Sequence, residues 1–198
     1  MTLILASQSA GRIAMLNAAG VAVKVVPALV DEDSIKTSLT EAGAKPRDLA
    51  DALAEAKARK VSRKVPTALV LGCDQICVGA DGHVFDKPKT PEDARAHLAR
   101  LSGSVHRLLS AAVICKGGAP VWRVVDTAQM TMRPLSPTFI DNYVDTYWDD
   151  IRHCVGCYRI EAEGAQLFAN VSGSQFTIIG MPLLPLLDYL RIRGLLPT

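Results

Sequence analysis

Strongly basic segments, long hydrophobic runs and a secretory leader are all missing from this sequence. The formal net charge is only +2, and the nearest approach to a basic run, at 57–64, has the helical spacing of a solvated face. We therefore expect no nucleic-acid and no membrane partner. The first twelve residues lack a basic segment and contain only four consecutive apolar residues, which argues against a signal peptide. The most hydrophobic tract, 176–187, is too short to span a bilayer and is interrupted by a glycine and two prolines. A cytoplasmic protein is expected.

Complete metal-binding and nucleotide-binding signatures are missing as well. The five cysteines form an odd number, which in a chain without a secretory signal predicts reduced thiols. His153, Cys154 and Cys157 could form half of a zinc site, but no second pair of ligands follows, so we expect ordinary thiols. Neither GxxxxGK[ST] nor GxGxxG occurs, and this disfavours the common nucleotide-binding folds.

Hydrophobic periodicity and turn residues predict a mixed α/β protein without internal repeats. The expected helices cover about 10–19, 46–64, 90–101, 136–147 and 182–193. The expected strands cover 3–6, 21–26, 68–72, 76–78, 83–85, 168–171 and 176–179. Two longer strands are expected on either side of 116–120, the first beginning near 105 and the second ending near 132. Segments 28–45 and 148–164 are expected to be irregular. Helices alternate with single strands and with hairpins, which indicates a mixed sheet. The length allows one α/β domain or two tightly joined lobes, and we expect a single domain over 1–198.

The segment after the first expected strand could bind phosphate. Ser7 and Ser9 precede a helix, whose amino terminus presents unpaired N–H groups and the positive end of the helix dipole. Arg12, in the first turn, could place its guanidinium on two phosphate oxygens. A capped helix with a surface arginine would have the same residues, so both interpretations stay open.

Asp74 is a candidate catalytic group or metal ligand. It follows the apolar run 69–72, and a carboxylate directly after a buried strand lies at the edge of the sheet where α/β proteins bind ligands. It could hold a divalent cation or orient a water molecule for attack on phosphorus, or it could simply end the strand by bonding nearby backbone. A phosphatase of the haloacid dehalogenase type is disfavoured, because its second aspartate would stand at position 76, which is Ile76.

Three further charged side chains could complete a site for a triphosphate and its metal. Lys57 lies on the long expected helix, Lys87 follows the expected hairpin, and Glu32 belongs to an acidic segment. Each of them could also be a solvated surface residue.

Several segments together resemble the Maf family. The opening LILASQSAGRIAML is similar to the family's LASxSPRRxxLL, LGCDQICV is similar to its [G]xD[TQ] strand, and DKP is similar to its [GEDK]KP turn. An LAxxKA helix precedes the aspartate, and LSG, IDNYV and GxPL segments follow it in the family's order. The resemblance covers essentially the whole chain, and the joint occurrence of these segments is specific although each one alone is not.

This resemblance implies a mixed twisted sheet flanked by helices, in two ITPase-like lobes with a central cleft, and a homodimer as the usual assembly. It also implies Mg²⁺- or Mn²⁺-dependent cleavage of nucleoside triphosphates to the monophosphate and pyrophosphate. The matching positions are Asp74 for the catalytic acid or base, Ser7, Arg12, Lys57 and Lys87 for phosphate binding, and Glu32 for a carboxylate near the metal. We expect both lysines to be exposed at the cleft.

Departures from the family pattern concern the base that is recognised. The chain lacks the proline and first arginine of SPRR, and Ala56 replaces the glutamate of EKA. Gln75, in place of the threonine of the dTTP/UTP-cleaving branch, and Glu161 resemble the branch that cleaves 7-methyl-GTP. A carboxylate can also accept from a guanine's N1–H and N2–H₂, and a buried Glu161 would be unpaired against a pyrimidine. Gly11 stands where that branch carries tryptophan, so an aromatic platform is missing. A guanine-type or modified-purine triphosphate is expected; the alternatives are a dTTP/UTP pyrophosphatase and a non-catalytic nucleotide-binding regulator of cell division.

Overall fold

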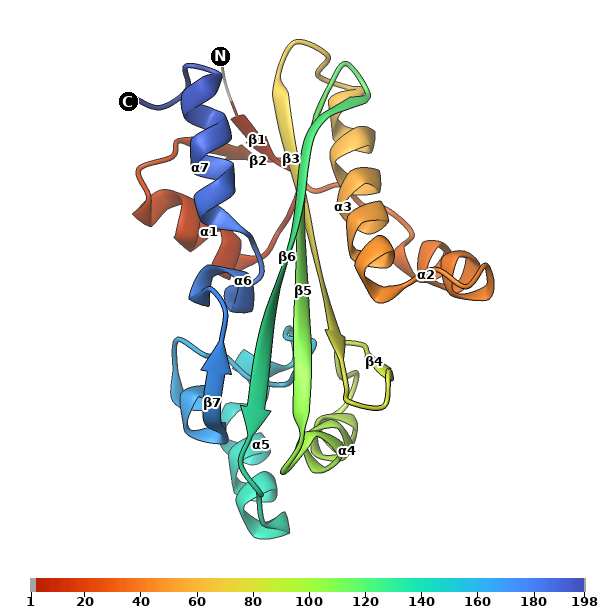
Figure 1. Cartoon of the computed structure of the whole chain (residues 1–198), viewed down its shortest axis with the longest axis vertical. Helices are drawn as coiled ribbons and strands as arrows, with labels where there is room; N and C mark the ends of the chain where they lie inside the picture. Colours follow the sequence, from red (N-terminus) through yellow and green to blue (C-terminus); the bar gives the residue numbers. More distant parts are fainter. Residues whose placement is uncertain (1–2, 198) are drawn as a thin grey trace. The chain divides into compact units, whose positions relative to one another are not determined.

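The fold was analysed in a computed structural model that describes residues 3–197 (Figure 1). Within these residues the chain has seven α-helices and a seven-stranded sheet with the order β2-β1-β3-β5-β6-β7, and β4 pairs with β3. Parallel and antiparallel pairs both occur. The predicted class, a mixed sheet with helices, is therefore confirmed.

The chain divides into two compact units. The first contains the residues up to 75, residues 110–126 and the residues from 180 onward, and the second contains 76–109 and 127–179. Strands β3 (Leu69–Val78), β5 (Val105–Lys116) and β6 (Ala119–Met132) contribute residues to both units. The single domain and the cleft expected from the sequence stay predictions.

In the first unit, β1 (Leu3–Leu5) pairs in parallel with both β2 (Val23–Val25) and β3. The helices of this unit are α1 (Ala10–Ala18), α2 (Glu32–Glu41), α3 (Pro46–Ser62) and α7 (Leu183–Ile192) (Figure 1). A small apolar core joins the strands to α3 through Ile4, Ala6, Ala28, Val61 and Val70. On β6, Trp122 stacks on Tyr189 of α7 with ring centroids 5.2 Å apart.

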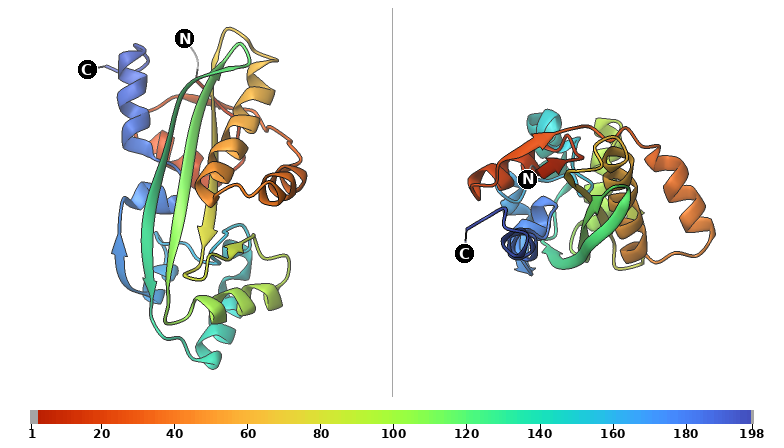
Figure 2. Two further views of the ribbon diagram at one scale, coloured as in Figure 1. Left: turned by 45° about the vertical axis from the view of Figure 1, so that its right-hand side comes forward. Right: turned by 90° about the horizontal axis from the view of Figure 1, so that it is seen from above.

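In the second unit, β4 (Val84–Phe85) runs antiparallel to the end of β3, with Cys77 opposite Phe85, and this confirms the predicted hairpin. The other elements are α4 (Pro91–Leu101), α5 (Pro137–Ile151), the 3-10 helix η1 (Glu163–Leu167), β7 (Phe168–Ser172) and α6 (Gln175–Ile179). Helices α4 and α5 lie side by side (Figure 2). Thr90 and Asp93 form the capping box that starts α4, where the sequence placed the helix start.

Two predicted segments have the wrong structure. Residues 28–45 were expected to be irregular but contain α2, which begins at the capping residue Asp31 and buries no side chain. Residues 176–179 were expected to form a strand but belong to α6, because a short apolar run has no periodicity that separates strand from helix. The segment expected to be irregular after 147 is helical up to Ile151 and again in η1.

The strand that leads to Asp74 is longer than predicted. We expected it to end at Gly72 and Asp74 to follow it, but β3 continues to Val78 and contains Asp74. A carboxylate can lie inside a buried strand when a cation neutralises it, and Lys57 does so here.

No helix in residues 3–197 is both long enough and apolar enough to cross a membrane.

Candidate active site

The turn between β1 and α1 is shaped by two serine hydroxyls. Ser7 Oγ accepts a hydrogen bond from the backbone N–H of Ser9 at 3.2 Å. Ser9 is the N-cap of α1, and its hydroxyl accepts from the backbone N–H of Arg12. The first turn of α1 contains no acidic side chain. The positive end of the helix dipole is therefore not offset locally by a carboxylate, which favours an anion at this end.

Arg12 is fixed by uncharged acceptors. Its Nε donates to the carbonyl oxygen of Gly180 at 2.8 Å, and its Nη1 donates to the carbonyl oxygen of Cys73 at 3.1 Å and to Ser7 Oγ at 3.4 Å. These acceptors orient the guanidinium without neutralising its charge. No local pattern predicts the Gly180 carbonyl as a partner, although Gly180 belongs to the GxPL segment.

Lys57, Asp74 and Glu32 form one ionic cluster in the first unit. Lys57 Nζ lies 2.6 Å from Asp74 Oδ1 and 3.0 Å from Glu32 Oε2. The side chains of Lys57 and Asp74 are 11% and 8% exposed, whereas that of Glu32 is 40% exposed. Ser7 and Arg12 are in the same unit, and the Arg12 guanidinium contacts the residue next to Asp74.

The expectation that Lys57 is exposed is wrong. A close approach between α3 and β3 explains its burial: a Cβ added to Gly72 would lie 2.2 Å from the carbonyl oxygen of Ala54 and 2.7 Å from the N atom of Ala58. Only glycine allows the two backbones to come so near. Lys57 lies in this same turn of α3, between Ala54 and Ala58, and so reaches Asp74, two residues after Gly72 on β3.

The thiol beside Asp74 is not suited to nucleophilic chemistry. Burial raises the pKa of Cys73 to about 11, although the nearby charges of Arg12 and Lys57 oppose that shift. The thiolate is the nucleophilic form, so Cys73 stays protonated at neutral pH. Asp74, rather than its neighbour, is the reactive candidate here.

The predicted base-selecting residues fall in different units. Gln75 follows Asp74 on β3, and its Nε2 donates to the hydroxyl of the buried Ser110 at 3.0 Å. Ser110 was missed because it lies inside an apolar strand, where the sequence gives no sign of its partner. Gly11 lies in the first turn of α1.

Lys87 and Glu161 belong to the second unit. Lys87 is exposed, as predicted, in the segment after β4. Glu161, which we expected to be buried, is exposed in a turn, and its Oε1 accepts a hydrogen bond from Arg159 Nε at 3.4 Å. An exposed, paired carboxylate loses little when a base offers it no donor, so this exposure does not support a part for Glu161 in base selection, which stays a prediction.

The oxygen ligands of the ionic cluster fit a hard divalent cation that is bound together with a phosphate. Mg²⁺ is usually held by one or two carboxylates, with phosphate oxygens and water completing its ligands, and Asp74 and Glu32 provide two carboxylates. Residues 3–197 contain no group of three or more His, Cys, Asp or Glu side chains placed to hold a metal by themselves. Of the residues considered for a zinc site, Cys157 contacts His97, with Sγ and Nδ1 3.6 Å apart.

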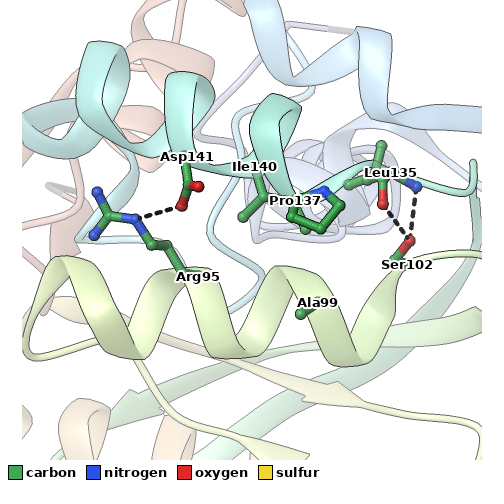
Figure 3. Close-up of a pocket in the computed structure, with 7 residues that line it drawn as sticks. All are labelled: Arg95, Ala99, Ser102, Leu135, Pro137, Ile140 and Asp141. Carbon is green, nitrogen blue, oxygen red and sulfur yellow. Dashed lines mark hydrogen bonds and ion pairs between the residues drawn. The ribbon is translucent and has the colours of Figure 1, made fainter.

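A separate hollow lies between α4 and α5 in the second unit (Figure 3). It has a volume of about 220 Å³ and is lined by Arg95, Ala99, Ser102, Leu135, Pro137, Ile140 and Asp141. Arg95 Nε donates to Asp141 Oδ1 at 3.0 Å across one end of the hollow. None of the predicted site residues lines it.

Comparison with known proteins gives a consistent family. The profile of the family described as Maf-like protein matches residues 2–192. A nucleoside triphosphate pyrophosphatase of Sphingopyxis alaskensis is 54% identical over the full length of both chains. A 7-methyl-GTP pyrophosphatase of Mesorhizobium japonicum is 50% identical and covers 97% of this chain and 96% of its own. Among solved structures, a HAM1 protein from Coxiella burnetii is 13% identical, with a TM-score of 0.44 over 67% of this chain and 73% of that one.

Proposed function

The chain belongs to the Maf family, and from that premise we propose that it hydrolyses a nucleoside triphosphate, with a guanine-type or modified purine base, to the monophosphate and pyrophosphate. Its class is that of its relatives, a hydrolase acting on phosphoric anhydrides. The observation that carries the proposal is the ionic cluster of Lys57, Asp74 and Glu32 in the same unit as Arg12 and the start of α1.

Asp74 is the group that handles the proton of the attacking water. Its carboxylate lies 2.6 Å from Lys57 in the nucleotide-free protein, and with a triphosphate bound it can orient a water molecule in line with the phosphorus and accept its proton. Glu32, which is more exposed, is the second carboxylate of the same cluster. A bound Mg²⁺ or Mn²⁺, which Asp74 and Glu32 would hold, would neutralise charge on the phosphate oxygens and lower the pKa of water.

The cationic side chains bind the phosphates and stabilise the leaving pyrophosphate. Arg12 is already oriented by three acceptors and still carries its full charge, which is the preorganisation that such stabilisation needs. Lys57 can exchange a carboxylate oxygen for a phosphate oxygen, and Ser7 and the N–H groups of α1 add neutral donors. Lys87, in the second unit, stays a predicted phosphate-binding residue. A homodimer stays a prediction from the family.

The base preference rests mainly on Gln75. An amide can bond either edge of a base, and Ser110 limits how the Gln75 amide can rotate. Gly11 provides no aromatic face for a cationic methylated guanine, so selection for 7-methylation should be loose. Relatives of nearly equal identity carry the names of both a general and a 7-methyl-GTP enzyme, so similarity alone does not decide the base.

Pyrophosphate release from GTP, 7-methyl-GTP, dTTP and UTP, each with Mg²⁺ or Mn²⁺, tests the proposal. We expect the purines to be cleaved faster and Gly11→Trp to increase the preference for 7-methyl-GTP over GTP. A preference for dTTP and UTP would refute the base assignment but not the class. Binding without any pyrophosphate release would instead favour a non-catalytic regulator.

A further inference from the structure

The ammonium of Lys57 occupies the position that a cation held by Asp74 and Glu32 would need. It contacts one oxygen of each carboxylate, at 2.6 Å and 3.0 Å. A divalent ion ligated by the same two oxygens would meet the ammonium at close range, and like charges at such a distance repel strongly in a poorly hydrated site. Metal and ammonium therefore compete for one pair of carboxylates.

The backbone restricts how far the ammonium can retreat. Gly72 lets α3 approach β3 within backbone contact, and this fixes the origin of the Lys57 side chain beside Asp74. The Lys57 side chain is only 11% exposed, so the charge cannot simply swing into water. Leaving Asp74 without a partner would also be unfavourable, because an unpaired buried charge loses its hydration without compensation.

The local charge balance also opposes a metal that arrives alone. Two carboxylates share one ammonium, and Arg12 adds a second cation that contacts the carbonyl of Cys73, the neighbour of Asp74. The affinity of a site for a hard divalent ion increases with its net negative charge. A triphosphate reverses the balance, because its oxygens attract both Lys57 and Arg12 and bring ligands of their own.

We propose that Lys57 is an internal competitor of the divalent cation. In the protein without nucleotide, its ammonium holds Asp74 and Glu32 and keeps the affinity for free metal low. When a triphosphate binds, the ammonium transfers to phosphate oxygens and the two carboxylates become available to the metal. The protein therefore takes up its metal together with the triphosphate. This inference rests on the proposed function and adds to it an order of binding.

The test measures metal binding without turnover. Equilibrium dialysis of the nucleotide-free protein against Mn²⁺ should show weak binding for the wild type. Lys57→Met, which removes the charge but keeps an unbranched side chain, should bind Mn²⁺ at least about tenfold more tightly, or about 1.4 kcal/mol. Lys57→Arg, which keeps the charge, should bind as weakly as the wild type. Adding inorganic triphosphate to both compartments should increase the Mn²⁺ retained by the wild type.

Lys60→Met is the matched control, because Lys60 lies on the same helix but is exposed and bonds the carbonyl of Leu29. It should leave Mn²⁺ binding unchanged. Tight Mn²⁺ binding by the wild type alone, or no gain in Lys57→Met, would overturn the proposal. If Lys57→Met does not fold, Lys57→Gln, which also removes the charge but keeps a polar side chain beside Asp74, takes its place in the same comparison. None of these measurements has hydrolysis as its readout, so a failure of the pyrophosphatase assignment would be seen separately.

Discussion

At the scale of single residues, the proposed chemistry depends first on Asp74. Asp74→Asn keeps the size of the side chain and an oxygen that can accept from Lys57, but it removes the charge that takes up a proton. We expect turnover, measured as pyrophosphate release, to fall at least about a hundredfold. The melting temperature should change little, because Glu32 still neutralises Lys57. Glu41→Gln, an exposed carboxylate at the end of α2, is the control. Near-normal turnover in Asp74→Asn would remove Asp74 from the mechanism.

Replacing Lys87 can show whether this lysine binds the substrate or supports the fold. It is exposed, so Lys87→Ala should lower turnover clearly and leave thermal stability nearly unchanged. Lys89→Ala, an exposed lysine two residues later, should change neither. Steady-state kinetics and thermal melting of both variants check this. A Lys87→Ala protein that unfolds while its folded fraction keeps full activity would show that the lysine is structural.

At the scale of elements, the contact between α3 and β3 places the ionic cluster. In Gly72→Ala, the new methyl group would overlap backbone atoms of Ala54 and Ala58, which cannot rotate away. We expect a loss of about 1–3 kcal/mol in the free energy of unfolding, as for other overpacked sites, and a large fall in turnover because Lys57 is displaced from the position where it meets Asp74 and the phosphates.

Gly43→Ala is the matched control for this substitution. Gly43 has a φ of 76°, but no atom lies within 4 Å of an added Cβ. The cost should be about 1 kcal/mol of backbone strain, with turnover retained. Urea unfolding and pyrophosphate release of the two variants provide the comparison. Equal turnover in Gly72→Ala and wild type would show that the close approach does not position the cluster.

The elements that the sequence predicted well are those with strong end signals or clear periodicity. The helix that begins at Pro91 has both a capping box and a proline in its first turn, and the β3–β4 hairpin has Gly82 at a φ of 82°. Helix α2 was missed because it buries no residue, so its sequence carries no apolar stripe. Its stability comes from the Asp31 cap and from tertiary contacts with α3.

The candidate site was only partly accessible from the sequence. The residue types around Ser7, Arg12 and Asp74 identified it, because phosphate binding needs donors and cations near a helix start. Two partnerships could not be foreseen: the burial of Lys57 against Asp74 and the Gln75–Ser110 hydrogen bond. Both depend on how a helix or a neighbouring strand packs on β3, which no local pattern records.

At the scale of the whole molecule, stability should depend on pH through His106. Its Nε2 is 2.7 Å from the Tyr158 hydroxyl, its Nδ1 has no hydrogen-bond partner among the described residues, and burial lowers its pKa from 6.5 to about 4. Well above pH 6.5 the imidazole is neutral in both the folded and the unfolded chain, so it has no effect there. Between about pH 6.5 and 4 the unfolded chain binds the proton more readily, and stability falls as the pH falls.

The expected loss over that range is about 3 kcal/mol. Urea unfolding at pH 7.5 and at pH 5 should record about 2 kcal/mol of this loss, because pH 5 lies above the lowered pKa. His106→Gln can still bond Tyr158 but takes up no proton, so its stability should fall less between the two pH values. Parallel pH dependences in wild type and His106→Gln would exclude His106 as the cause.

Strands β3, β5 and β6 contribute residues to both units, so neither unit is a continuous stretch of sequence. Truncation therefore cannot isolate one of them. The protein carries two tryptophans, and each unit has one: Trp122, stacked on Tyr189 in the first, and Trp148, packed against the core of the second. Trp122→Phe and Trp148→Phe leave one fluorophore each. The emission of the two variants would report the unfolding of each unit separately, and coincident midpoints would mean that β3, β5 and β6 make the two units melt as one.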